Sequence, residues 1–237
     1  MKNTEVVHKY IVQAASEDHL HYAETICAEM EESAKKRGTG IAKRSPVYIM
    51  EKMIEGKAII ATTVEGVWVG FCYIETWEHG KFVANSGLIV HPDFRNSGMA
   101  KAIKQKAFEL SRKKYPDAKI IGITTSLPVM KINSDLGYEP VTFSELPADE
   151  SFWKGCASCV NYDVLTRTGK KHCLCTGMMY NPDDHKKAAK TKEKEKDSWD
   201  FLTESSLYER WMRIKQRILL RREERAKKKN AGAILVH

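Results

Sequence analysis

The stretch HPDFRNSGMAKAIKQKAFELSRKKYP, residues 91–116, contains the feature that decides the fold. Arg95, Gly98 and Ala100 form an R-x-x-G-x-A turn, and the apolar periodicity that follows it predicts a helix over roughly 98–114. The first amides of a helix have no intrahelical partner and lie at the positive end of the helix dipole, so this turn forms a site for a phosphate. Glycine and alanine let the backbone approach the anion, and Arg95 adds a positive charge.

Strands and helices alternate around this turn. β-branched and aromatic runs separated by Glu65-Gly66 and His79-Gly80 predict a three-strand antiparallel meander. The expected elements, in chain order, are a strand at 7–15, a helix at 17–37, a helix with Pro46 near its start and Gly56 just past its end, strands at 58–64, 67–77 and 81–90, a helix at 98–114, a strand at 119–125, a helix at 129–136 and a strand from Glu139.

This order of elements resembles the GNAT superfamily of acyl-CoA-dependent N-acyltransferases, whose CoA-binding motif is Q/R-x-x-G-x-G/A at this point of the topology. LIVHPDF (88–94) is similar to the strand that leads into that motif, and NSDLGYEP (133–140) resembles the Gly-aromatic step that closes the domain. The resemblance covers roughly residues 5–145. It implies an α/β (α+β) fold: a mixed, mostly antiparallel sheet with splayed fourth and fifth strands, flanked by helices.

The resemblance also implies acyl-CoA, as acetyl-CoA or succinyl-CoA, as the co-substrate. The turn would cradle its pyrophosphate, and the preceding strand would pair with the pantetheine arm and aim an N–H at the thioester oxygen. One such preorganised donor is typically worth about 3 kcal/mol. The cofactor-binding residues implied are Leu88, Ile89, Val90, Arg95, Asn96, Ser97, Gly98, Met99, Ala100 and Asn133.

The acceptor amine must lose a proton before it attacks, so the reaction needs a base. Glu75 is the first candidate and Glu78 the second, and the alternative is that both are ordinary exposed carboxylates. Members of the superfamily often carry a tyrosine acid where this sequence has Asn133. An amide cannot act as an acid, so solvent, Tyr138, Tyr73 or another group must protonate the departing thiolate.

The acceptor is expected in the cleft between the splayed strands, covered by the loop KKRGTGIAKRSP at residues 35–46. Guanidinium groups and hydroxyls suit a small carboxylate substrate, although the loop could equally be a solvated basic segment. The candidate acceptor-binding residues are Arg37, Thr39, Lys43, Arg44, Thr124, Thr125 and Ser126.

We expect three parts in the chain: the acyltransferase domain at 1–147, a cysteine-containing extension at 148–185, and a charged linker with a basic amphipathic helix at 186–237. The extension resembles a bacterial GNAT-type N-acylglutamate synthase subgroup associated with arginine biosynthesis, which implies glutamate as the acceptor. Its C-x-x-C and C-x-C pairs could hold a structural zinc, form buried thiols or act as a redox pair. The four residues concerned are Cys156, Cys159, Cys173 and Cys175.

The net charge of +8 comes entirely from the C-terminal part of the chain. Residues 1–185 hold 23 basic and 23 acidic residues, whereas residues 186–230 hold 16 and 8. This balance argues against nucleic-acid binding around the cleft, because phosphate-backbone binding requires basic residues there. The basic helix could dock on its own domain or a homodimer partner, lie on an acidic membrane surface, or touch nucleic acid.

Two classes of function therefore stay open: a small-molecule acyltransferase, and a nucleic-acid-associated module or an enzyme that acts on another amine, a protein or RNA. The sequence has no apolar run of the ~20 residues that a membrane span needs. Its first thirty residues lack the apolar core of a secretory signal, so we expect a cytoplasmic protein.

Overall fold

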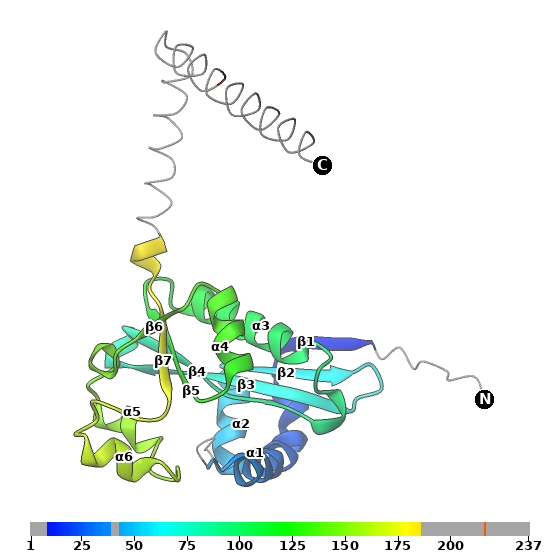
Figure 1. Ribbon diagram of the computed structural model, residues 1–237. Helices are drawn as coiled ribbons and strands as arrows, with labels where there is room; N and C mark the ends of the chain where they lie inside the picture. The colour runs from blue at the N-terminus through cyan, green and yellow to red at the C-terminus, as the bar shows by residue number, and fades with distance from the viewer. Residues whose placement is uncertain (1–8, 39–42, 186–215, 217–237) are drawn as a thin grey trace, which may run out of the picture. The chain divides into compact units, whose positions relative to one another are not determined.

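The computed structural model describes residues 9–38, 43–185 and 216 (Figure 1). The expected order of helices and strands is present, with one strand and two short helices added near the end. The elements are β1 Tyr10–Ala14, α1 Ala23–Arg37, α2 Pro46–Ile54, β2 Ala58–Thr63, β3 Trp68–Trp77, β4 Phe82–Val90, α3 Met99–Lys114, β5 Lys119–Thr124, α4 Leu127–Asp135, β6 Glu139–Val141, α5 Glu150–Lys154, α6 Tyr162–Arg167 and β7 Thr176–Tyr180.

A single seven-stranded sheet has the strand order β1-β2-β3-β4-β5-β7-β6. All neighbouring strands are antiparallel except β4 and β5, which pair in parallel over only three positions, from Phe82–Lys119 to Ala84–Ile121. Beyond these positions the two strands separate. The mixed, mostly antiparallel sheet with splayed fourth and fifth strands is thus confirmed.

A bulge in β4 lies beside this separation. The register between β3 and β4 shifts here, and Gly87 has a φ of 64°. A Cβ at this position would lie 2.5 Å from Cε1 of the Tyr73 ring, so only glycine fits. The bulge lies between the part of β4 that pairs with β5 and the last residues of β4.

Helices cover both faces of the sheet (Figure 1). On one face, α1 and α2 bury Ile26, Ile49 and Met53 against β2, β3 and the end of β4. On the same face, α5 and α6 cover the other half of the sheet through Phe152, Trp153 and Leu165. The opposite face is covered by α3 and by the helix α4. Between these two pairs of helices, part of β4 and β5 is left uncovered on this face and lines a cleft.

Part of the expected extension belongs to this sheet. β7 lies between β5 and β6 and pairs with both of them, Ile121 with Met179 and Pro140 with Met178. The compact unit that contains the sheet runs to Pro182. Of the charged segment at 186–237, all but Gln216 lies outside the described residues. Within the ranges that the structure describes, no helix has the length and apolar character that a membrane span requires.

Candidate active site

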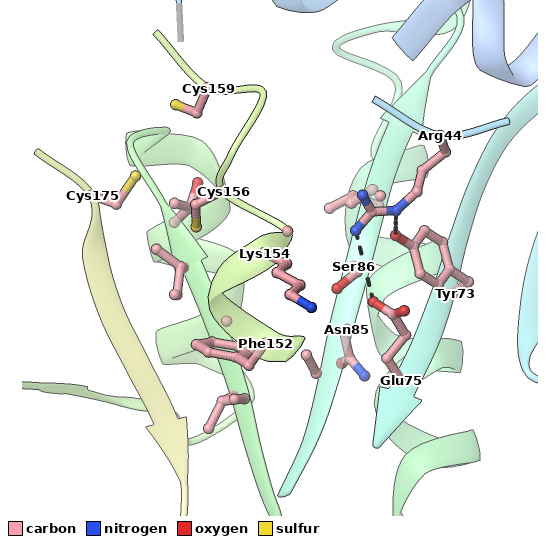
Figure 2. Close-up of a pocket in the computed structure, with 18 of the residues that line it drawn as sticks. Arg44, Tyr73, Glu75, Asn85, Ser86, Phe152, Lys154, Cys156, Cys159 and Cys175 are labelled. Atoms are coloured by element: carbon pink, nitrogen blue, oxygen red, sulfur yellow. Dashed lines mark hydrogen bonds and ion pairs between the residues drawn. The ribbon is translucent and has the colours of Figure 1, made fainter. Parts of the chain in front are cut away.

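A cleft of about 940 Å³ opens where β4 and β5 separate. One wall is the segment 43–45 with Tyr48 and Lys52 of α2, and the floor comes from β3, β4 and β5. The other wall is formed by residues 151–165 and the cysteines, and Figure 2 shows Arg44 on one side with Lys154 and Cys156 on the other. The amide of Lys43 donates to Ser158 Oγ at 3.1 Å, so the first wall is tied to the second. The predicted acceptor loop therefore meets the cysteine-bearing segment at this cleft.

Arg44 is held in the cleft by contacts on three sides. Its Nε donates to Tyr73 Oη at 2.8 Å, and its terminal Nη2 lies 3.9 Å from Glu75 Oε2 (Figure 2). Its guanidinium carbon lies 5.3 Å from the centre of the Tyr48 ring. Only 19% of the side chain is exposed, so this cation has a fixed position in a partly desolvated site.

Glu75 points into the cleft from β3 with 17% of its side chain exposed (Figure 2). Burial raises the pKa of its carboxyl, while the charge of Arg44 acts in the opposite direction. A carboxylate with a raised pKa in a cleft is a suitable proton acceptor. Glu78 does not line this cleft: its Oε1 accepts a hydrogen bond from the Ala148 amide at 2.9 Å. The structure thus brings Glu75, but not Glu78, to the site.

The predicted phosphate turn has the backbone that its residues favour. Gly98 is the N-cap of α3 with a φ of 83°, and Asn96 also has a positive φ of 62°. A Cβ on Gly98 would meet no atom within 4 Å, so the space next to the turn is open. Ser97, Met99 and Ala100 complete the turn, and the first amides of the helix are available to an anion.

Arg95 has protein partners. Its Nε donates to the Val90 carbonyl at 3.1 Å, and its terminal nitrogen donates to Glu29 Oε1 at 2.8 Å and to Ser33 Oγ at 2.9 Å. These contacts join the turn to α1. The guanidinium thus positions the phosphate turn, a role that the motif alone does not reveal.

The last residues of β4, where the sequence predicts the pantetheine arm, lie at an edge of the cleft. Leu88 lines the cleft, whereas Ile89 and Val90 are buried at 4% and 8% exposure. Pairing with β5 ends at Ala84, so the β5-facing side of this segment has no strand beside it. Its backbone can therefore pair with an extended ligand.

Asn133 and Tyr73 line the cleft, whereas Tyr138, the other candidate tyrosine, is buried at 2% exposure. Asn133 is 1% exposed; its Nδ2 lies 3.6 Å from Met178 Sδ, and its Oδ1 has no hydrogen-bond partner among the described residues. Tyr138 donates its hydroxyl hydrogen to Asn85 Oδ1 at 3.0 Å, and burial raises its pKa well above the usual value. Burial also raises the pKa of Tyr73, whose oxygen accepts from Arg44. Neither phenol is suited to donate a proton to a thiolate.

The structure describes only some of the remaining candidate acceptor residues. Arg37 is the last residue of α1, but its side chain and the whole of Thr39 lie outside the described residues. Lys43 lines the cleft next to Arg44, with its Nζ 3.8 Å from Glu31. The end of β5 also lines the cleft, through Thr124, Thr125 and Ser126.

Several of the residues that line the cleft could not be predicted from the sequence. Lys52, Lys57, Lys104 and Lys154 all line the cleft, and Lys154 extends into it from the end of α5 (Figure 2). Lysines are common on helices, and nothing in their spacing separates these four from solvated ones. Only the packing of α5 onto the sheet brings Lys154 opposite Arg44.

The four cysteines of the extension line the same cleft but do not form a metal site. In the described part of the chain, no group of three or more His, Cys, Asp or Glu side chains is placed to hold a metal ion, so the structural zinc expected at Cys156, Cys159, Cys173 and Cys175 is not supported. Three of them pack against the apolar cluster under α5 and α6. Burial, with the neighbouring thiols, raises the pKa of Cys156 to about 11 and that of Cys175 to about 12. They behave as half-buried thiols.

At pH 7 the native protein is expected to react slowly with iodoacetamide at Cys156 and Cys175. The thiolate is the reactive form, and a raised pKa leaves little of it, so alkylation should be at least about tenfold slower than in urea. Mass spectrometry of peptides after timed quenching measures both rates. Equal rates in native and unfolded protein would contradict the burial of these thiols.

Comparison of the sequence with known protein families agrees with this fold. Residues 28–128 match the acetyltransferase (GNAT) family. A part of this chain thus matches a GNAT acetyltransferase domain. The seven-stranded sheet confirms the fold expected from the sequence. The match supports the expected enzyme class, an acyl-CoA-dependent N-acyltransferase. No curated protein sequence matches the chain significantly.

Two solved structures share the GNAT fold. N-acetylglutamate synthase from Neisseria gonorrhoeae, complexed with coenzyme A and N-acetyl-glutamate, has a TM-score of 0.52 and 13% identity over 73% of this chain and 35% of its own. The Mycobacterium tuberculosis protein Rv2747, in complex with CoA and NLQ, has a TM-score of 0.52 and 14% identity over 72% of this chain and 98% of its own. The chain thus spans about a third of the length of the Neisseria enzyme.

Proposed function

We propose that this chain transfers an acetyl or succinyl group from acyl-CoA to the amine of a small acidic acceptor, with glutamate as the best candidate. The amine attacks the thioester directly in a ternary complex. The observation that carries the proposal is the charge of the cleft around Arg44. A cytoplasmic role in arginine biosynthesis belongs to the same proposal.

The cleft offers many cations and little negative charge. Six basic residues line it, and Glu75 is the only carboxylate among the lining residues that the structure describes. Glutamate has two carboxylates and one ammonium, so it suits this balance, whereas a polyamine would be repelled. The basic residues are Lys43, Arg44, Lys52, Lys57, Lys104 and Lys154.

Residues of the cleft and of the turn before α3 can be assigned parts in this reaction. The amides of the turn at Asn96–Ala100 bind the pyrophosphate of CoA, and the edge of β4 at Leu88–Val90 holds the pantetheine arm. An N–H of that edge stabilises the oxyanion of the tetrahedral intermediate. Glu75 accepts the proton that the acceptor amine must lose. The Neisseria enzyme, which was solved with coenzyme A and N-acetyl-glutamate, has the same fold and supports this pairing of ligands.

Arg44→Ala is expected to lower kcat/KM for glutamate by about 10-fold to 100-fold, because a charge-assisted hydrogen bond to a carboxylate is worth about 1.5–3 kcal/mol. Arg44→Lys should recover part of the loss, since it keeps the charge without the planar fork. The affinity for CoA should stay within about twofold, because the phosphate turn lies elsewhere in the domain. Kinetics with glutamate varied at saturating acyl-CoA measures the effect.

The matched control is Arg167→Ala, which removes an arginine that is 73% exposed on α6 and leaves the cleft unchanged. A polyamine or a peptide lysine that outperforms glutamate in the parent enzyme would contradict the proposal. Parent-like kinetics of Arg44→Ala with glutamate would contradict the assignment of the acceptor carboxylate to Arg44.

A further inference from the structure

A lysine without an acidic partner lies at the floor of the cleft. Lys104 on α3 is 2% exposed, yet it belongs to the residues that line the cleft. Its Nζ lies 5.1 Å from the centre of the Tyr138 ring. Among the described residues, no carboxylate contributes to its electrostatic environment, and the titratable groups near it are Cys72 and Tyr138. A buried ammonium without a counter-ion is costly, so this position calls for an anion that arrives from outside the chain.

Asparagine side chains line the same cleft as Lys104. Asn85 on β4 accepts a hydrogen bond from Tyr138 and donates one to Ser111 Oγ at 2.8 Å. Asn133 contributes the unpartnered Oδ1 described above, and a Cβ on Gly122 of β5 would lie 3.5 Å from its Nδ2. Lys104 therefore reaches, from the α3 side, the place where β4 and β5 separate.

Glu75 and Lys104 approach this place from opposite faces of the sheet. The neighbours of Glu75 are Arg44 and Tyr73, which belong to the face covered by α1 and α2. Lys104 is part of the buried side of α3, which packs on the other face. A thioester held at the edge of β4 would have a carboxylate on one side and an ammonium on the other.

We propose that Lys104 is the catalytic acid of the reaction, and that its ammonium pairs with and protonates the thiolate of CoA as it leaves. This inference rests on the proposed function in one respect, namely that an acyl-CoA thioester occupies the cleft. Lys104 donates the proton that neither Asn133 nor the two phenols can donate. The anion that pairs with the buried ammonium is then the CoA thiolate, which forms during the reaction.

The proton balance of this step is complete. The acceptor ammonium first loses one proton to solvent. The neutral amine nitrogen then forms a bond to the thioester carbon, and Glu75 takes the second proton that the nitrogen loses. The C–S bond breaks, the electron pair goes to sulfur, and Lys104 transfers a proton to the sulfur to give the free thiol. Water then carries a proton from the Glu75 carboxyl to the neutral Lys104 amine, so the products are an amide and CoA thiol.

The titration of Lys104 suits this role. Burial lowers the pKa of Lys104 to about 8, close to the value of about 8.5 of an ordinary thiol. Proton transfer between groups of similar pKa is efficient. The two titratable groups that face it are neutral in this range, because burial raises the pKa of Cys72 to about 11 and that of Tyr138 well above its usual value. The acid is active when protonated, so kcat should fall as the pH rises through the pKa of Lys104.

Lys104→Met tests the proposal with acetyl-CoA and glutamate as substrates. Its kcat should fall by about 100-fold or more, and the loss of rate at alkaline pH that the parent shows should disappear. Lys104→Arg keeps a charge that cannot be deprotonated, so it should be slow without an alkaline limb near pH 8. The control Lys106→Met changes a neighbouring lysine that is 51% exposed, and it should keep the kcat and pH profile of the parent.

A second measurement uses CoA alone and needs no turnover. Ultraviolet absorbance of the thiolate gives the pKa of the thiol of bound CoA, which a nearby ammonium lowers. The pKa of that thiol should be at least about one unit lower in the parent than in Lys104→Met, a difference that a purely structural lysine would not produce. Lys104→Gln serves in the same titration if the methionine variant does not fold, as judged by circular dichroism.

Three outcomes overturn the proposal. The first is a folded Lys104→Met enzyme with the kcat and alkaline limb of the parent. The second is a loss confined to succinyl-CoA, which would make Lys104 a ligand of the acyl carboxylate. The third is an unchanged thiol pKa in the CoA titration. If the parent releases no thiol with any amine, the proposed function fails, and the CoA titration still decides the role of Lys104.

Discussion

CoA binding is expected to be lost when Gly98 is replaced with aspartate, while the fold is retained. The new carboxylate would stand at the turn that receives the pyrophosphate. Two like charges 4 Å apart repel by about 4 kcal/mol at an effective dielectric constant of 20, which corresponds to about a thousandfold in affinity. Because no atom lies within 4 Å of the position of a Cβ on Gly98, the side chain itself meets no obstacle. Isothermal titration calorimetry with CoA measures the change.

Gly98→Asn is the matched control for this experiment. Asparagine has the shape of aspartate and tolerates the positive φ of 83° at this position, but it carries no charge. It should lower the affinity for CoA by less than about tenfold, since only backbone strain and some steric overlap remain. An unchanged affinity in a folded Gly98→Asp variant would contradict the assignment of the turn to the pyrophosphate.

Glu75→Gln is expected to lower kcat by about 100-fold to 10,000-fold, the usual contribution of a general base. The base acts when it is deprotonated. Because burial raises the pKa of Glu75, the parent should lose activity as the pH falls through that raised value, and the acid limb should be absent in the variant. Steady-state kinetics over a range of pH at saturating acyl-CoA gives both results.

Glu78→Gln makes the same chemical change at the carboxylate outside the cleft. Its Oε1 accepts from the Ala148 amide, so we expect some loss of stability and a kcat close to that of the parent. An acid limb that persists in Glu75→Gln, or a larger loss of kcat in Glu78→Gln, would show that Glu75 is not the base.

The turn at Arg95–Ala100 and the alternation of elements around it could be predicted from the sequence, because both depend on local patterns. β7 was not predicted. The run TGMMY at 176–180 is short and lies after an irregular segment, and its partners are β5 and β6, which are distant in sequence. Pairing of that kind is decided by tertiary packing rather than by local propensity.

The cleft shows a similar division between local and tertiary information. Arg44 could be proposed from the composition of its loop, whereas its hydrogen bond to Tyr73 depends on how α2 packs against β3. Lys104 lies among other lysines of α3, and its burial follows only from the close approach of that helix to the separating strands. The partners of Arg95 on α1 could not be predicted from the sequence either, since Ser33 is 62 positions away from Arg95.

The most direct test of the central claim is the identity of the acylated product. Purified protein is incubated with glutamate and either acetyl-CoA or succinyl-CoA, thiol release is followed, and the product is identified by mass spectrometry beside parallel reactions with alanine, spermidine and a lysine peptide. The account predicts N-acylglutamate with one thiol released per product, and a higher kcat/KM for glutamate than for the other three amines. Thiol release with a polyamine or the peptide in preference to glutamate, or no N-acylglutamate with either acyl-CoA, would contradict it.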